Sequence, residues 1–150
     1  MRAVLDTNIL VRANPKAAGV ACALLAEFAA SREHTLIVSP FLLEEVERVL
    51  AYPRLQALWP LTPEEIEEYI GALHELSEMV YPGSAPTVVS ADPEDDPVIQ
   101  TALLGQAECL CTLDRHLYAP EIVAFLRRHS IVVLNDVQLL KRLRSDAATR

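Results

Sequence analysis

Acidic side chains stand at four separated places along the chain where they could act on a common ligand. They are Asp6, one of Glu45 and Glu47, one of Asp95 and Asp96, and Asp114. If folding gathers these carboxylates, their mutual repulsion raises each pKa, and a divalent cation removes that penalty. Oxygen ligands of this kind suit Mg²⁺ or Mn²⁺. Such ions polarise phosphoryl oxygens and activate water, so the pattern predicts metal-assisted attack on phosphorus.

The first of these acids ends an apolar run. Asp6 follows residues 3–5, and a run of that length beside a polar turn is typical of a buried strand. The carboxyl end of a parallel strand is where open α/β sheets bind their ligands. A carboxylate buried there requires a partner. Asp6 could instead only cap the turn, but the three later acids favour a shared site.

The second acid lies on a helix that Ser39 caps and Pro53 ends. Consecutive helical residues turn about 100°, which places Glu44 opposite the apolar stripe and toward solvent. Glu45 and Glu47 fall near opposite margins of the stripe, so the helical wheel does not choose between them. A solvated acidic face is the alternative interpretation. The stripe consists of Leu42, Leu43, Val46, Val49 and Leu50.

The third and fourth acids border later elements. Asp95 lies seven residues before Ala102, on the inward stripe of the next helix, whereas Asp96 suits a cap. Asp114 follows the apolar strand 109–112 by two residues and could also cap the short segment after it. Both positions are compatible with ligands at the end of a sheet.

Strand and helix patterns alternate along the whole chain, and this arrangement would position the acids. Five apolar strands separated by helices imply a parallel sheet covered on both faces, in a three-layer α/β/α fold. The expected strands lie at residues 3–5, 35–39, 87–89, 109–112 and 131–134. Thr62 and Asn135 open further helices, and Asp136 suits the dipole of the last one. One domain over 1–144 is expected, with a frayed tail at 145–150.

Charge is unevenly distributed along a chain of net charge −8. Residues 62–96 hold ten acidic and no Lys or Arg residues, whereas 115–150 are net basic. This acidity argues against a nucleic-acid coat protein, although an acidic site with a basic rim remains possible. The basic residues of this last segment could form that rim or be ordinary solvated helix faces. They are Arg115, Arg127, Arg128, Lys141, Arg142 and Arg144.

Two function classes find no support. No Ser or Cys nucleophile has a neighbouring base, and no glycine-rich phosphate loop is present. Cys109 and Cys111 would share one face of a strand, which suits core thiols better than a disulfide, and a reduced, cytoplasmic setting is expected. No apolar stretch approaches the roughly 20 residues that span a bilayer, so no membrane association is expected.

Four sequence blocks, taken together, resemble the PIN domain family of metal-dependent ribonucleases. Toxins of prokaryotic toxin–antitoxin pairs belong to this family, and the chain most resembles that branch. The similarity extends from Val4 to about Asn135. The blocks are Val4-Leu5-Asp6-Thr7-Asn8, Ser39 to Val46, Asp92-Pro93-Glu94-Asp95 with Ala102, and Ala107 through Thr112-Leu113-Asp114-Arg115-His116-Leu117.

The resemblance implies roles for particular residues. It selects Glu45 over Glu47 and Asp95 as the third ligand, and it makes Asn8 and Thr112 supporting residues. Family members commonly have asparagine after the third acid, where this chain has Asp96. The choice between Asp95 and Asp96 therefore stays open.

The resemblance also implies an activity and partners. It implies Mg²⁺- or Mn²⁺-dependent hydrolysis of single-stranded or structured RNA, with Arg115 and His116 as RNA contacts. A homodimer is implied, as is a cognate antitoxin if the protein belongs to a toxin pair. The alternative is a catalytically inactive PIN-fold module that binds RNA or protein.

Overall fold

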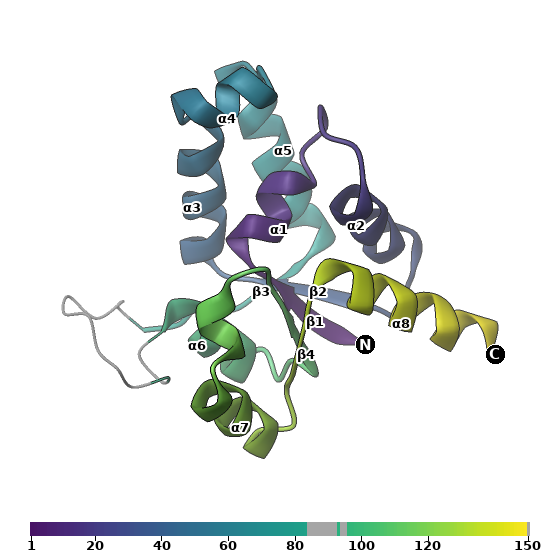
Figure 1. Cartoon of the computed structure of the whole chain (residues 1–150). Coiled ribbons are helices and arrows are strands. Elements are labelled where there is room, and N and C mark those ends of the chain that lie inside the picture. Colours follow the sequence, from purple (N-terminus) through teal and green to yellow (C-terminus); the bar gives the residue numbers. More distant parts are fainter. Residues whose placement is uncertain (84–92, 94–95, 150) are drawn as a thin grey trace.

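A parallel five-stranded sheet forms the centre of the molecule (Figure 1). The computed structural model describes residues 1–83, 93 and 96–149. The strand order is β3-β2-β1-β4-β5, and every pairing is parallel. This confirms the predicted fold class. The strands are β1 Arg2–Leu5, β2 Thr35–Val38, β3 Glu78–Met79, β4 Cys109–Cys111 and β5 Val132–Leu134.

Helices cover both faces of the sheet, as expected for buried parallel strands. Figure 1 shows α6 and α7 on one face and the other long helices on the opposite face. No helix within the described residues is long and apolar enough to cross a membrane. The helices are α1 Thr7–Arg12, α2 Val20–Ala30, α3 Pro40–Leu50, α4 Pro53–Leu58, α5 Pro63–Leu76, α6 Pro97–Leu104, the 3-10 helix η2 Arg115–Tyr118, α7 Pro120–Arg128 and α8 Asp136–Ala148.

Alternate residues of the central strands supply two separate cores, because successive strand side chains point to opposite faces. Ala3 and Leu5 of β1 pack with α1, α2, α3, α5 and α8. Val4, between them, packs instead with residues of α6 and α7. All three side chains are fully buried. The short strands therefore hold the layers together, and their carboxyl ends are left for the loops.

Capping residues start several helices where the sequence predicts them. The Ser39 side chain accepts a hydrogen bond from the Leu42 N–H at 3.4 Å. Thr62 and Glu65 form a reciprocal capping box on α5. Asn135 and Gln138 form another on α8. Each cap fixes the direction in which a helix leaves the sheet.

Several elements differ from the sequence prediction. The strand expected at 87–89 lies outside the described residues, and β3 instead follows α5 directly at Glu78–Met79. Helices α1, α4 and α7 were not predicted, and the last two each begin at a proline, Pro53 and Pro120. The tail expected to fray from residue 145 is helical through Ala148.

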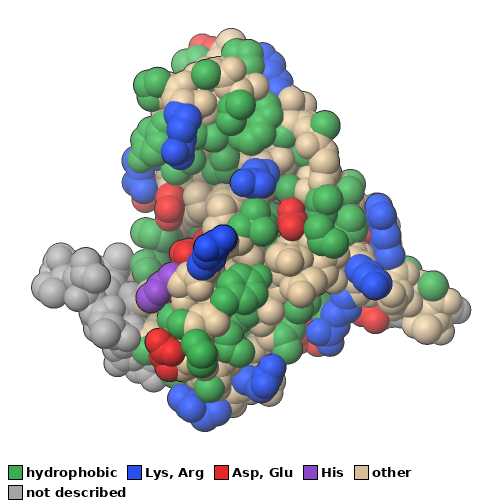
Figure 2. Space-filling model, viewed as in Figure 1, with side chains coloured by type: hydrophobic (Ala, Val, Ile, Leu, Met, Phe, Trp, Pro, Cys, Tyr) green, Lys and Arg blue, Asp and Glu red, His purple; other side chains and the backbone are tan. Residues whose placement is uncertain are grey.

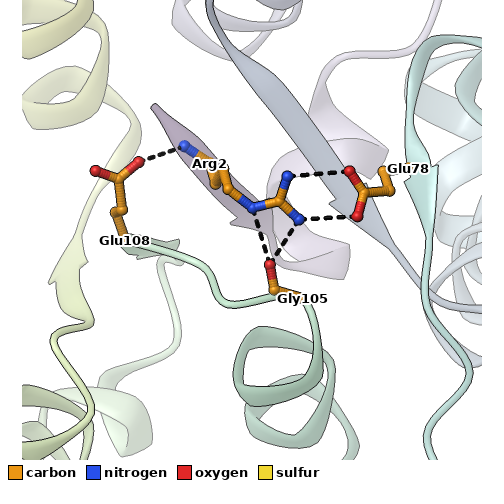
Figure 3. Close-up of polar contacts among 4 residues, drawn as sticks. All are labelled: Arg2, Glu78, Gly105 and Glu108. Atoms are coloured by element: carbon orange, nitrogen blue, oxygen red, sulfur yellow. Dashed lines mark hydrogen bonds and ion pairs between the residues drawn. The ribbon is translucent and has the colours of Figure 1, made fainter.

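The amino ends of the strands are joined through one arginine (Figure 3). The Arg2 guanidinium donates to both carboxylate oxygens of Glu78, at 3.0 and 2.9 Å. Its Nε and Nη2 donate to the Gly105 carbonyl at 3.0 and 2.7 Å. The Arg2 backbone N–H donates to Glu108 at 2.8 Å. Strand β1 is thereby tied to β3, to the end of α6 and to the start of β4.

Candidate active site

Asp6 lies where β1 ends and α1 begins, and it is held by three hydrogen bonds. Its Oδ1 accepts from the Thr7 N–H at 2.8 Å, which caps α1. Its Oδ2 accepts from the Thr112 hydroxyl at 2.7 Å and from the Asn8 side-chain amide at 3.3 Å. Only 7% of Asp6 is exposed. These contacts fix the orientation of the carboxylate.

Thr112 and Asn8 extend this network to the loop after β4. The Thr112 hydroxyl accepts from the Asp114 N–H at 2.9 Å, and Asn8 Oδ1 accepts from the Leu113 N–H at 3.1 Å. The Asn8 amide also donates to the Thr112 hydroxyl at 3.3 Å. Two residues expected to support the site thus connect the ends of β1 and β4. The position of Asp114 depends on this connection.

A cavity of about 910 Å³ opens at the carboxyl ends of the strands. Asp6, Glu45, Asp114 and Asp136 all line it. Figure 2 shows acidic side chains among Lys and Arg side chains around the hollow in the middle of this face. The remaining lining residues are Thr7, Asn8, Val11, Arg12, Ala18, Val20, Ala21, Val49, Arg54, Leu55, Leu58 and Trp59.

The structure separates the two candidate glutamates that the helical wheel leaves equal. Glu45 is half-buried and lines the cavity, whereas Glu47 is exposed and lies outside the cavity lining. Glu45 is also close enough to raise the pKa of Asp6. Glu45 and Asp6 therefore share one electrostatic environment.

The third acidic block is only partly described. Asp95 lies outside the described residues. Asp96 caps α6 through hydrogen bonds from the Val98 and Ile99 N–H groups, at 2.8 and 3.4 Å. It does not line the cavity, although its charge contributes to the raised pKa of Asp6. Asp96 thus has a structural role as a cap and an electrostatic influence on the site.

The pKa of Asp6 is raised above its ordinary value, and burial is the main cause. The hydrogen bonds from Thr112 and Thr7 act in the opposite direction because they stabilise the ionised form. The charges of Asp96 and Glu45 raise the pKa further. A cation in the cavity would relieve this excess of negative charge.

The donor set of the cavity fits a hard divalent cation in its chemistry. Its negatively charged side chains are all carboxylates, and the buried Thr7 hydroxyl oxygen has no hydrogen-bond partner among the described residues. However, within residues 1–83, 93 and 96–149, no three His, Cys, Asp or Glu side chains form a group able to hold one ion. Mg²⁺ commonly binds through one or two carboxylates and retains several waters. Asp6, Glu45, Asp114 and Asp136 are the carboxylates of the cavity that would be available to such an ion.

Some lining residues were missed or interpreted differently from the sequence. Asp136 was assigned to the dipole of α8, but it also faces the cavity. Arg12, Arg54 and Trp59 were not predicted to lie there. The segment that carries Arg54 and Trp59 had one available signal. Leu55 is followed by apolar residues three and four positions later, which is a helical spacing.

The residues expected to contact RNA lie beside the cavity. Arg115 and His116 are exposed on η2, directly after Asp114, and neither lines the cavity. The basic residues that do line it are Arg12 at the end of α1 and Arg54 in α4.

The chain thus combines a parallel α/β fold with a cavity at the carboxyl ends of its strands that Asp6, Glu45 and Asp114 line. Residues 2–116 match the family described as PIN domain, and the chain therefore belongs to the PIN domain family. PIN domains are generally nucleases. None of the curated proteins matches the sequence.

Proposed function

We propose that the protein is a metal-dependent endoribonuclease that hydrolyses RNA phosphodiester bonds. The observation that supports this proposal is the meeting of Asp6, Glu45 and Asp114 on one cavity at the carboxyl end of the sheet. These acids come from three segments far apart in the sequence. Membership of the PIN domain family, whose members are generally nucleases, supports the same activity.

Asp6, Glu45 and Asp114 would hold Mg²⁺ or Mn²⁺, with Asp95 as the fourth predicted ligand and Asp96 as its alternative. When bound, such an ion polarises the phosphodiester and helps to activate water. The chain itself keeps the Asp6 carboxylate oriented, through the Thr112 hydroxyl and the Asn8 amide.

Thr112 and Asn8 are therefore positioning residues. The Asp114 N–H bond to Thr112 and the Leu113 N–H bond to Asn8 keep the β4 loop next to Asp6. Loss of a group that orients a metal ligand in this way typically costs about 10–100-fold in metal affinity or activity.

The resemblance of the sequence to toxins of the PIN family also suggests a cellular role and partners. We propose that the protein is the toxin of a toxin–antitoxin pair, acts as a homodimer and is blocked by a cognate antitoxin. A small upstream open reading frame with a DNA-binding segment would support this part, and sedimentation of the purified protein would measure the dimer.

The test of the activity is cleavage of RNA with Mn²⁺ by the Asp6→Asn variant. We expect at least a roughly 100-fold loss, by analogy with losing a metal ligand or its orienting partner. Glu45→Gln should also reduce cleavage, whereas Glu47→Gln is the matched control because Glu47 is outside the cavity lining. Undiminished cleavage by Asp6→Asn would place the activity in another protein of the preparation.

A second candidate is a PIN-fold module that binds RNA or protein without cutting. The observation that favours it is that the described residues contain no three-acid group able to hold an ion. Calorimetry with Mn²⁺ near neutral pH separates the two functions. Measurable binding that Asp6→Asn abolishes supports the nuclease, whereas absent binding supports the module.

A further inference from the structure

One wall of the acidic cavity is apolar and comes from α4 and the residue that ends it. Leu58 is 65% exposed, and Trp59 is partly buried against the core while it lines the cavity. Leu55 of the same helix is 8% exposed and anchors the segment. Leu58 and Trp59 therefore present apolar surface in the same cavity as the acids, where it is available to the apolar face of a ligand.

This wall is fixed in position from both sides. Leu61, two residues after Trp59, is 3% exposed within the main core. The Lys16 ammonium donates to the Pro60 carbonyl at 2.5 Å and lies 3.5 Å from Glu65. The aromatic surface is therefore presented by a held segment, which lowers the entropy cost of binding.

Two arginines flank the same cavity. Arg12 and Arg54 are exposed, and neither guanidinium pairs with another residue among those that the structure describes. By contrast, Arg2 and Arg144 are both paired with carboxylates. A free guanidinium beside an acidic site is suited to phosphate, which it can bind with two parallel hydrogen bonds.

We propose that this wall is a base-binding subsite for single-stranded RNA. One unpaired base lies against Trp59 and Leu58, and the adjoining phosphates contact Arg12 and Arg54. This deepens the proposed function and rests on it, because the strand held here is the one presented to Asp6. The cavity of about 910 Å³ is within the usual range of about 300–1,000 Å³ for ligand sites.

The geometry favours an unpaired strand over a duplex. A base inside a duplex has both faces covered by its neighbours, so it cannot reach an aromatic wall without leaving the stack. Sequence-tolerant stacking on aromatic side chains combined with a basic groove is the usual way to bind single strands. The acids that line the same cavity would repel the phosphates, so the two arginines are needed to guide the strand.

Trp59 is the sole tryptophan of the chain, which makes the proposal directly measurable. The intact protein in EDTA is titrated with a single-stranded RNA oligonucleotide and, separately, with a fully paired RNA duplex. We expect the single strand to quench Trp59 fluorescence and the duplex to leave it unchanged. Quenching by both to the same extent, or by neither, overturns the proposal.

A second test measures the affinity of variants for a labelled single-stranded RNA by fluorescence anisotropy. Trp59→Ala should weaken binding about tenfold, by the usual effect of losing one stacking partner. Trp59→Phe should stay within about threefold because the ring is kept. Leu58→Ser changes an exposed side chain, so it tests the wall even if Trp59→Ala does not fold. Unchanged affinity in both Trp59→Ala and Leu58→Ser contradicts the subsite.

Arg54→Ala should weaken binding and reduce the salt dependence by about 0.7 in log–log slope, as expected for one lost phosphate contact on a single strand. Arg32→Ala is the matched control, because Arg32 is exposed and outside the cavity lining. An equal effect of both variants means general charge attraction and overturns the phosphate contact.

Binding in EDTA and cleavage with Mn²⁺ are read separately, so the two proposals fail differently. Quenching without cleavage keeps the base subsite and rejects the nuclease. Cleavage with no response of Trp59 rejects the subsite and keeps the nuclease. Absence of both binding and cleavage rejects the two together.

Discussion

Replacing Thr112 by valine should destabilise the protein in a way that depends on pH. The hydroxyl donates to Asp6 at 2.7 Å and accepts from the Asp114 N–H at 2.9 Å and from Asn8 at 3.3 Å. Valine keeps the shape and removes all three hydrogen bonds. Because Thr112 is fully buried and its main partner is a carboxylate, the free energy of unfolding should fall by about 2–3 kcal/mol at neutral pH.

The pH dependence follows from the pKa of Asp6. The Thr112 bond lowers that pKa and so opposes the effect of burial, and the variant raises it further. The folded variant then binds more protons than the folded wild type, and its stability falls more steeply as pH rises through the Asp6 pKa. Below that range only the loss of neutral hydrogen bonds remains, about 1 kcal/mol.

The assay is urea unfolding at pH 7 and at pH 3, which is below the ordinary Asp pKa of 3.8, with Thr112→Ser as the control. Serine keeps the hydroxyl and loses one methyl group, which costs about 0.8 kcal/mol at either pH. A double-mutant cycle with Asp6→Asn isolates the pairwise term. If Thr112→Val costs the same at both pH values, or no more than Thr112→Ser, the hydroxyl does not support the Asp6 carboxylate.

Three further predictions concern other parts of the molecule. A Cβ at Gly105 would stand 2.5 Å from the buried Ile37 side chain, so Gly105→Ala should lower the free energy of unfolding by about 1–3 kcal/mol in urea unfolding; an unchanged midpoint contradicts this contact. Because the pKa of Asp6 is raised from 3.8, mainly by burial, its ionisation costs stability above the folded pKa. The stability of Asp6→Asn relative to wild type should therefore rise between pH 4 and 7, and a flat difference would count against a buried charge. Cys109 and Cys111 are both buried, and burial raises the pKa of Cys109 to about 12 and also raises the pKa of Cys111. A thiol reagent should therefore label only Cys22 in the native protein and all three cysteines in urea.

Much of the fold follows from local chemistry. The apolar run before Asp6 predicts β1 because a short run of that kind requires burial on both faces of a parallel sheet. The caps at Ser39, Thr62 and Asn135 each predict where a helix begins, since a side-chain oxygen satisfies the first N–H groups. These signals depend only on residues within one turn of each other.

The remaining features depend on contacts between distant segments. Strand β3 has two residues, Glu78 and Met79, and its pairing with β2 arises after the layers have packed. The helical wheel could not choose between Glu45 and Glu47, because the choice depends on where α3 meets the cavity. Trp59 reaches the site because α4 turns back from α3, and no periodic pattern of that length specifies this turn.

The arginine bridge of Figure 3 lies at the amino ends of the strands, whereas the acids lie at their carboxyl ends. The contacts that tie the strands together and the acids of the candidate site thus lie at opposite ends of the strands of one sheet. The Asp6→Asn variant should therefore keep every contact of Arg2. Under the proposed function, such a variant would bind its RNA strand without cutting it and could be used to capture that RNA.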